Sequence, residues 1–547
     1  MCPPSRANSA LLLTIVIRYK PAILAPTNSR FVKPFDMACS KPGHFLLTLA
    51  AGLLWVGIAS AATLPSSGNS TTNTTREYDY VIVGGGLTGL VVANRLSEDP
   101  KVSVLVLEYG IIDRSNTTRV PYYGTSLNIG AMFNITSGPE PAMQNRSYAV
   151  RAGSIAGGGS SVNGMTLDRA SAGDYDSWEL LGNPGWGWDG LLPYFKKSTD
   201  FDPPPPEIVE KYNYTYDESW YGEDASPLKS TIPHWQAPDT YTFFDGLDEL
   251  EIPYIEEHAA GTAIGQFWTP ASIHPTKLER SSSLTSYYDP VSARPNLVLL
   301  TQHQVKTLTF NKGTTTVTGV RALNRPKNET INFTAKREVI LAAGSIHTPQ
   351  ILQLSGIGPA SILKAAGVDV RLDFPAVGSN FQDHPVAYLN WNLTNTEPQP
   401  NELATNATFN AEALQLYLTN RTGPYTKAQS NSVAFLSLEM ILGSADAASV
   451  MVEELKSQEH RDYLPYIYSA DDEVNAGFEA QREIIAEQLI ASDVAVLEFP
   501  FSGLGSVPNA LQKPLSRGTV YLNATHPEAE PVLKYVFARR EIMMTLI

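Results

Sequence analysis

Three glycines and one glutamate near the front of the chain have the spacing of a dinucleotide site. They follow the apolar run Tyr78–Val83 and read Gly84-x-Gly86-x-x-Gly89, and Glu108 ends the next apolar run. In such a motif the first glycine permits a tight turn, the second admits a pyrophosphate, and the third lets helix and strand pack closely. The helix start attracts phosphates, and the acid accepts hydrogen bonds from ribose hydroxyls. The pattern predicts a dinucleotide cofactor, the alternative being a glycine-rich turn without a ligand.

A second glycine-rich segment follows 64 residues after Gly89. Four glycines occur within the seven residues from Gly153 to Gly159, and Asn163, Gly164 and Thr166 come after them. This composition is unsuited to the interior of a helix or strand. Its backbone can wrap closely around a flat or anionic group, although a purely structural loop has the same composition.

A βαβ unit must position the first motif. Tyr78–Val83 and Val102–Leu107 are short apolar runs typical of buried parallel strands, and Leu87–Leu96 has helical spacing. The region after the proline run Pro203–Pro206 is aromatic-rich and is expected to be irregular, like a cap over a site. Further strands are expected at Asn296–Thr301, Val305–Phe310 and Glu338–Ala343, and helices at Ser444–Leu455 and Glu473–Ile490.

The composition indicates a folded protein that does not bind nucleic acid. The chain has 547 residues, of which 43% are apolar, and a formal net charge of -15 at pH 7. This length predicts two large or interleaved domains. The acidic balance argues against nucleic acid, whose phosphates need a basic surface. Cys2 and Cys39 both precede the expected mature start, so we expect no disulfide and no cysteine ligand for a metal.

The N-terminal region has the pattern of a secretory signal. A weakly basic start at Met37 leads into the apolar run Phe45–Ile58, and cleavage is expected after Ala61. A membrane anchor is the alternative, but about 14 apolar residues fall short of the ~20 that span a bilayer. Residues 1–36 are expected to precede the true start, and residues 62–76 to be a flexible lead-in.

Glycosylation motifs support secretion. Twelve Asn-x-Ser/Thr sequons are more than chance would place in a chain of this length, which favours a secreted, extracellular glycoprotein. They lie at Asn69, Asn73, Asn116, Asn134, Asn145, Asn213, Asn328, Asn332, Asn392, Asn406, Asn420 and Asn523.

The two glycine segments together resemble those of the glucose–methanol–choline (GMC) flavoprotein oxidoreductases, closest to the glucose oxidase and fungal alcohol oxidase branch. The resemblance covers about residues 78–535 and implies a mixed α/β (α+β) fold, with a Rossmann-like FAD-binding domain interleaved with an antiparallel-sheet substrate cap domain. The implied FAD-binding parts are residues 77–197 and 273–385, the cap parts 198–272 and 386–505, and residues 506–547 begin a C-terminal segment. Further matching segments are Asp174–Trp178, Asn183–Trp188, Ala343–Gly358, Val377–Pro385 and Pro514–Gly518.

The resemblance also implies which residues contact FAD. Leu87 and Thr88 match positions at the pyrophosphate, and Glu108 matches the acid at the adenosine ribose. The residue whose backbone meets the adenine end corresponds to Val305.

The second glycine segment is implied to meet the flavin end. Asn163, Gly164 and Thr166 match positions along the isoalloxazine and the pyrophosphate. Gly159 stands where the family usually has serine, so a hydroxyl contact is lost while its N–H can still donate. The implied cofactor-binding residues are Gly84, Gly86, Leu87, Thr88, Gly89, Glu108, Gly159, Asn163, Gly164, Thr166 and Val305.

The resemblance stops before the family's catalytic segment. Family enzymes pass the hydroxyl proton of an alcohol to a histidine in a late His-Pro-x-Gly-Thr segment, a role that suits the pKa of histidine. The similarity to the family ends after Tyr535, and the chain as written ends at Ile547 without that segment. We therefore expect no catalytic residue in this chain and no alcohol oxidation by it. His526-Pro527 is the late candidate, but the residues after it do not fit; His347 and His384 are expected to be structural.

Three hypotheses follow for the activity. The first is a secreted FAD-dependent alcohol oxidase or dehydrogenase, truncated in this chain, with O₂ or another electron acceptor. The second is a flavin-binding protein without net redox, such as a cyclase or dehydratase of secondary metabolism. The third is a catalytically dead product of a disrupted gene. The aromatic cap would suit an aryl or polyketide-like substrate, while aromatics also stack on sugars.

Overall fold

A computed structural model describes residues 76–125, 129–222, 225–391, 397–399, 401–428, 431–501 and 505–535. The expected extension, the signal and nearly all of the lead-in lie outside these residues, as do Cys2, Cys39 and the sequons at Asn69, Asn73 and Asn392. Within the described part of the chain, no helix is long and apolar enough to cross a membrane.

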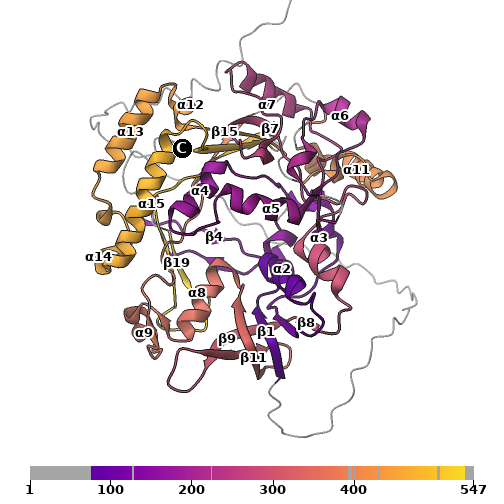
Figure 1. The fold of residues 1–547 in the computed structure, drawn as a ribbon. Helices are drawn as coiled ribbons and strands as arrows, with labels where there is room; N and C mark the ends of the chain where they lie inside the picture. The colour runs from indigo at the N-terminus through magenta and orange to yellow at the C-terminus, as the bar shows by residue number, and fades with distance from the viewer. Residues whose placement is uncertain are drawn as a thin grey trace, which may run out of the picture. The chain divides into compact units, whose positions relative to one another are not determined.

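A six-stranded sheet carries the first glycine motif (Figure 1). Four of its strands are parallel neighbours in the order β8, β2, β1, β11, and their register aligns Leu300, Leu107, Val83 and Leu341. Because these residues close their strands, the segments that follow them meet at one edge of the sheet. The sheet continues with β10, which is antiparallel to both of its neighbours, β11 and β9. The strands are β8 (Leu297–Leu300), β2 (Val104–Leu107), β1 (Arg76–Val83), β11 (Glu329–Leu341), β10 (Val317–Asn324) and β9 (His303–Phe310).

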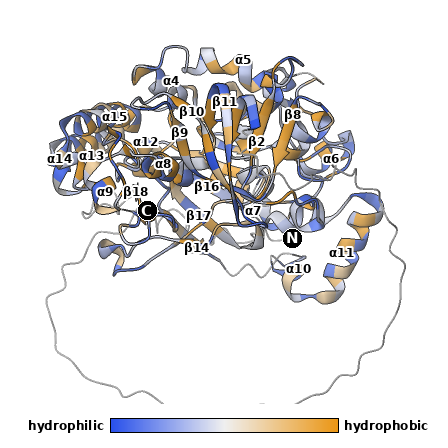
Figure 2. Cartoon of the chain, turned by 90° about the horizontal axis from the view of Figure 1, so that it is seen from below, coloured by the Kyte–Doolittle hydropathy of each residue, from blue (hydrophilic) through white to orange (hydrophobic). Residues whose placement is uncertain are grey.

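The predicted βαβ unit is confirmed. Helix α2 spans Leu87–Leu96, as expected, between β1 and β2. All four residues of β2 are buried, and Figure 2 shows this strand largely in the hydrophobic colour, as a strand covered on both faces requires. One expectation was wrong in its bounds: the strand at Glu338–Ala343 begins at Glu329 and ends at Leu341, because it also pairs with β10, for which we had no expectation.

A five-stranded antiparallel sheet builds the second layer. Its order is β14, β17, β16, β15, β7, which joins segments from both expected cap regions. Helices α13 and α15, side by side in Figure 1, contribute to a core with β15 and β16, so one face of this sheet is covered by helices. The strands are β7 (Gly265–Trp268), β14 (Val386–Asn390), β15 (Ser432–Leu436), β16 (Leu497–Phe501) and β17 (Ser506–Leu511). The predicted interleaving of a Rossmann-like sheet with an antiparallel sheet is therefore confirmed.

The predicted helices and several further ones complete the fold. The two helices expected at Ser444–Leu455 and Glu473–Ile490 are confirmed as α13 and α15, each beginning with a side-chain cap from Ser444 or Asp471. The region that we expected to be irregular after Pro206 contains regular elements, because Phe243, Phe244 and Leu247 give α7 a buried face. The main helices are α4 (Ala172–Leu180), α5 (Trp188–Ser198), α6 (Pro206–Tyr212), α7 (Asp239–Asp248), α8 (Gly344–Leu354), α9 (Ala360–Ala365), α11 (Ala407–Asn420), α12 (Leu438–Leu442), α13 (Ala445–Ser457) and α15 (Asp472–Ile490).

Candidate cofactor site

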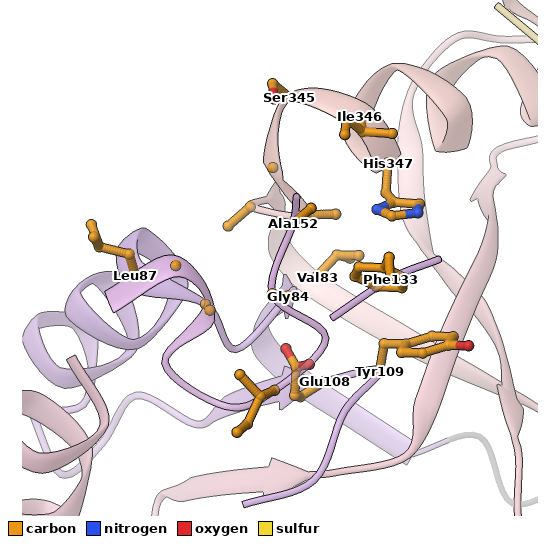
Figure 3. Close-up of a pocket in the computed structure, with 18 of the residues that line it drawn as sticks. Val83, Gly84, Leu87, Glu108, Tyr109, Phe133, Ala152, Ser345, Ile346 and His347 are labelled. Carbon is orange, nitrogen blue, oxygen red and sulfur yellow. The ribbon is translucent and has the colours of Figure 1, made fainter. Parts of the chain in front are cut away.

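A cavity of about 460 Å³ opens at the carboxyl ends of the parallel strands (Figure 3). Its walls come from the turn after β1, the end of β2, the second glycine segment and the residues after β11. Open α/β sheets bind their ligands at this edge because loops diverge there and leave a crevice. The topology therefore brings the two glycine segments to one site, although about 70 residues of sequence separate them.

The passage from β1 into α2 needs glycine at two positions, Gly84 in the turn and Gly89 in the first turn of the helix. Gly84 has φ +100°, and a Cβ there would lie 2.4 Å from the carbonyl oxygen of Ala342. A Cβ on Gly89 would lie 2.0 Å from the carbonyl oxygen of Gly84. Gly86 is different, because its nearest neighbour would be Gly158 Cα at 3.8 Å. The first and third glycines thus serve chain packing, and the second leaves open space at the cavity.

Glu108 fastens this turn to the end of β2. Its Oε2 accepts a hydrogen bond of 2.7 Å from the Gly85 N–H, and its Oε1 accepts one of 2.7 Å from the Gly110 N–H. Burial raises the pKa of Glu108, and the two N–H donors oppose that rise. Each carboxylate oxygen has a second lone pair, so Glu108 can also accept from a ribose hydroxyl.

The second glycine segment forms a short turn, η4 (Gly158–Ser161), against the first. The Gly157 N–H donates to Gly85 O at 2.8 Å, and Gly157 and Gly158 have φ of +88° and +52°. No atom would lie within 4 Å of a Cβ on Gly159, whose space is therefore open. The segment approaches the first glycine turn backbone to backbone, which larger residues would prevent.

Arg280 holds the end of this segment and has no motif that could reveal it in the sequence. Its guanidinium donates to Thr118 O at 2.8 Å, Ser160 O at 3.1 Å, Asn163 Oδ1 at 2.7 Å and Asn163 O at 2.8 Å. Burial lowers the pKa of Arg280 to about 10, so the side chain stays charged at neutral pH. Arg280 therefore fixes both the backbone and the side chain of Asn163.

Arg151 supplies positive charge at the cavity. Among the described residues that line the cavity it is the only arginine or lysine, it is exposed, and no side chain or carbonyl of the described chain pairs with it. A guanidinium in this state can bind an anion bidentately without first breaking an ion pair.

An aromatic row lines another wall of the cavity (Figure 3). The rings of Tyr109 and Phe133 lie 4.7 Å apart, and Phe133 lies 4.2 Å from His347. Outside the row, the Arg325 guanidinium lies 3.9 Å from the Tyr109 ring, and His347 Nε2 lies 2.9 Å from Glu530 Oε2. The expectation that His347 has a structural role is supported by these contacts, because both its ring face and its Nε2 are engaged.

A half-buried carboxylate lies on the cap sheet. Glu498 on β16 accepts a hydrogen bond of 2.7 Å from Gln512 Nε2. Burial, with a smaller contribution from the charge of Asp168, raises the pKa of Glu498 to about 7. Asp168 follows Asn163 by five residues, so Glu498 interacts with the chain that leaves the cavity. No motif in the sequence points to this residue, because its partial burial depends on the sheet.

Most, but not all, predicted cofactor residues reach the cavity. Gly89 lies one turn into α2 and packs on Gly84, while Thr166 forms a β-bridge with Ala271 of the cap. Gly164 lies between Asn163 and Thr166 and is likewise not part of the lining. The predicted residues that line the cavity are Gly84, Gly86, Leu87, Thr88, Glu108, Gly159, Asn163 and Val305.

The residues present fit FAD. The cavity offers a glycine turn at a helix start for a pyrophosphate, the carboxylate of Glu108 for a ribose, and the cation Arg151. An apolar wall that includes Val83, Phe133 and Ile346 completes it. Polar groups for phosphate and ribose beside an apolar wall are what a dinucleotide with flat rings needs.

Comparison with known proteins agrees with this site. A family model described as GMC oxidoreductase matches residues 78–386. The dehydrogenase xptC of Emericella nidulans is 35% identical over 505 residues, which cover 89% of this chain and 79% of that protein. A solved fungal aryl-alcohol oxidase is 38% identical with a TM-score of 0.81, covering 86% of this chain and 80% of its own. An FAD-dependent oxidoreductase from Chaetomium thermophilum is 35% identical with a TM-score of 0.79, covering 84% and 78%.

Proposed function

Because this chain belongs to the GMC oxidoreductase family, whose members bind FAD, we propose that its cavity holds FAD and that its cap presents an alcohol for oxidation. The observation that carries the proposal is the convergence of the glycine turn, Glu108 and Arg151 on one cavity at the strand ends. FAD, when bound, supplies the hydride acceptor. The fungal aryl-alcohol oxidase and the dehydrogenase xptC support an alcohol as the donor.

Different residues of the chain contact different parts of FAD in this proposal. The N–H groups at the start of α2, at Leu87 and Thr88, face a pyrophosphate in this proposal, and Arg151 neutralises its charge. Glu108 accepts from the adenosine ribose, and Val305 contacts the adenine end. Asn163, which lines the cavity, forms the flavin side in this proposal, with Arg280 as a positioning residue.

Replacing Arg151 by alanine should weaken FAD binding about tenfold to a hundredfold, the usual effect of losing a charge-assisted contact. The dependence of the affinity on ionic strength should also become weaker, because one screened attraction is removed. Titration of the apoprotein with FAD, followed by quenching of the flavin fluorescence at two salt concentrations, measures both. Arg151→Lys should recover part of the affinity, and Arg461→Ala, a surface change, should have no effect. Unchanged affinity and salt dependence in Arg151→Ala would exclude a phosphate contact.

Oxidation of an alcohol also needs a group that takes the hydroxyl proton. Among the described residues we propose Glu498, a half-buried carboxylate that interacts with Asp168 on the chain leaving the cavity and whose pKa of about 7 places it in its accepting form above neutral pH. The rate at which an alcohol bleaches the flavin absorbance without O₂ should therefore rise as the pH passes through about 7. In Glu498→Gln the rate should fall by about a hundredfold or more, and this rise should disappear.

Anaerobic mixing of the FAD-loaded protein with benzyl alcohol, an aliphatic alcohol and D-glucose tests the proposed function. Glu412→Gln, on the exposed side of α11, is the matched control and should behave as the wild type. A protein that binds FAD but is bleached by no alcohol would contradict the oxidoreductase proposal and favour the non-redox cyclase or dehydratase. Retention of the rate and pH profile in Glu498→Gln would exclude Glu498 as the acceptor.

We further propose that the protein is a secreted glycoprotein. Of the nine sequons in the described residues, eight have an exposed asparagine, and Asn523 is half-buried. Asn523 Oδ1 already accepts from the Thr525 and His526 N–H groups at 3.0 and 3.2 Å. Exposed acceptors are what glycan attachment requires, so a mobility shift on treatment with a glycosidase that removes N-linked glycans is the expected result.

A further inference from the structure

A groove of about 890 Å³ lies on the cap, apart from the cofactor cavity. Its walls come from the proline run at residues 203–206, from Val209 and Glu210 on α6, and from residues 420–422 at the end of α11. This volume is in the range of about 300–1,000 Å³ that holds a drug-sized ligand. None of the described residues that line the groove takes part in the proposed binding of FAD or of the alcohol.

Both ends of one glycosylation sequon line this groove. Asn420 is the last residue of α11, and Asn420 and Thr422 are both exposed. The Asn420 side chain makes no hydrogen bond with any described residue, whereas the amide of Asn406, in another sequon, donates to Glu402 Oε1 at 2.9 Å. The nitrogen to which a glycan is attached is therefore accessible at the edge of the groove.

The apolar part of the lining suits the carbon faces of sugar rings. The proline run offers ring carbons and no N–H groups, and it is extended at Pro205, where φ is −51° and ψ is 144°. Tyr216 is half-buried, and its ring lies 5.4 Å from that of Phe201, which limits its movement. A pyranose ring can place its C–H groups against such a ring, because the aromatic face is electronegative.

The polar part of the lining suits hydroxyl and acetamido groups. Asp202 and Glu210 are exposed, and their carboxylates make no hydrogen bond with any described residue, so both can accept from a sugar. Burial lowers the pKa of His234, so its neutral ring can both donate and accept at neutral pH. Arg421, the only lysine or arginine among the described lining residues, is paired with Glu279 at 3.4 Å. Two carboxylates without a free cation favour a neutral ligand over an anion.

We propose that the N-linked glycan of Asn420 folds back into this groove, where its inner N-acetylglucosamine residues pack on the proline run and Tyr216. The inference rests on the proposal that the protein is a secreted glycoprotein. A ligand tethered at the edge of its own site has an effective concentration of the order of millimolar, so weak contacts are enough to hold it. The glycan then joins the end of α11 to the proline run and α6.

The rate at which a glycosidase releases N-linked glycans from the native protein tests the inference. The full chain is secreted from a eukaryotic host, and release at each sequon is followed by mass spectrometry of its peptide. Asn328 is the reference site, because it is exposed at the turn between β10 and β11 and lines no described cavity. Release at Asn420 should be slower than at Asn328 by about tenfold or more, since the glycan must first leave the groove. In denaturant the two rates should be equal.

Replacing Tyr216 by alanine should bring the release rate at Asn420 close to that at Asn328. Glu210→Ala should raise the rate in part, and it keeps the test decisive if Tyr216→Ala does not fold, because Glu210 is exposed on α6. Tyr194→Ala is the matched control: Tyr194 is exposed on α5 outside the groove, so its loss should leave the rate unchanged.

Three results overturn the inference. They are an Asn420 without glycan while other sequons carry one, equal release rates at Asn420 and Asn328 in the native protein, and slow release that persists in both Tyr216→Ala and Glu210→Ala. A secreted protein without glycan at any sequon would instead contradict the proposed glycoprotein, and this inference with it. The proposed binding of FAD and oxidation of an alcohol are independent of all these results.

Discussion

Replacing Gly89 by alanine is expected to abolish FAD binding at ordinary FAD concentrations. The added methyl would lie 2.0 Å from the Gly84 carbonyl oxygen, so the start of α2 must move away from β1. Overpacking of this kind costs about 1–3 kcal/mol, and the phosphate-binding N–H groups at Leu87 and Thr88 would move with the helix. We expect a loss of FAD affinity of about a hundredfold or more, together with a lower free energy of unfolding. Fluorescence titration with FAD and urea unfolding of the apoprotein measure the two effects.

Two further glycine variants separate packing from cofactor contact. Gly477→Ala lies on the exposed part of α15, where no atom would approach the new methyl within 4 Å, and it should stabilise the fold by about 1 kcal/mol. Gly86→Ala should fold normally, because its methyl would meet no protein atom closer than 3.8 Å, yet it should weaken FAD binding. If Gly86→Ala binds FAD as the wild type does, the pyrophosphate does not lie against this turn. If Gly89→Ala is as stable as the wild type, the turn is looser than described.

Replacing Arg280 by methionine should lower the free energy of unfolding by about 3–5 kcal/mol and release the flavin. Methionine fills much of the same space but donates no hydrogen bond. The carbonyls of Thr118, Ser160 and Asn163, together with Asn163 Oδ1, would lose their donor in a buried place. Denaturant unfolding and the FAD content of the purified protein check the prediction.

Arginine variants nearby provide the controls for Arg280. Arg119→Met removes an exposed ion pair with Glu279, so it should cost no more than about 1 kcal/mol and leave FAD bound. Arg280→Lys keeps the charge but loses the planar fork, and its stability should lie between those of the wild type and Arg280→Met. Equal stability of Arg280→Met and Arg119→Met would show that the guanidinium does not hold the second glycine segment.

The solved relative is an aryl-alcohol oxidase, and exposed or half-buried aromatic rings are frequent in this chain's cap. Fold and cofactor are shared properties of the family, whereas the choice of alcohol depends on individual cap side chains.

The sequence by itself determined the βαβ unit, the cofactor and the interleaving of the two sheets. Local rules suffice for the unit: Tyr78–Val83 is an apolar run, Leu87–Leu96 has helical periodicity, and a tight turn needs glycine at Gly84. The cofactor and the interleaving of the two sheets followed from the match of several distant segments to one family. The sequence did not reveal which of the implied residues face the cavity, and Gly89, Gly164 and Thr166 do not line it.

Only the tertiary structure drew attention to Arg280, Arg151 and Glu498. Arg280 lies more than a hundred residues from the carbonyls it binds, and no local pattern records such a contact. Arg151 stands out because nothing in the described chain pairs with it, and Glu498 because packing in a sheet partly buries it and raises its pKa. Hydrogen bonding and burial of charge depend on which distant segments meet, and that is fixed by packing rather than by periodicity.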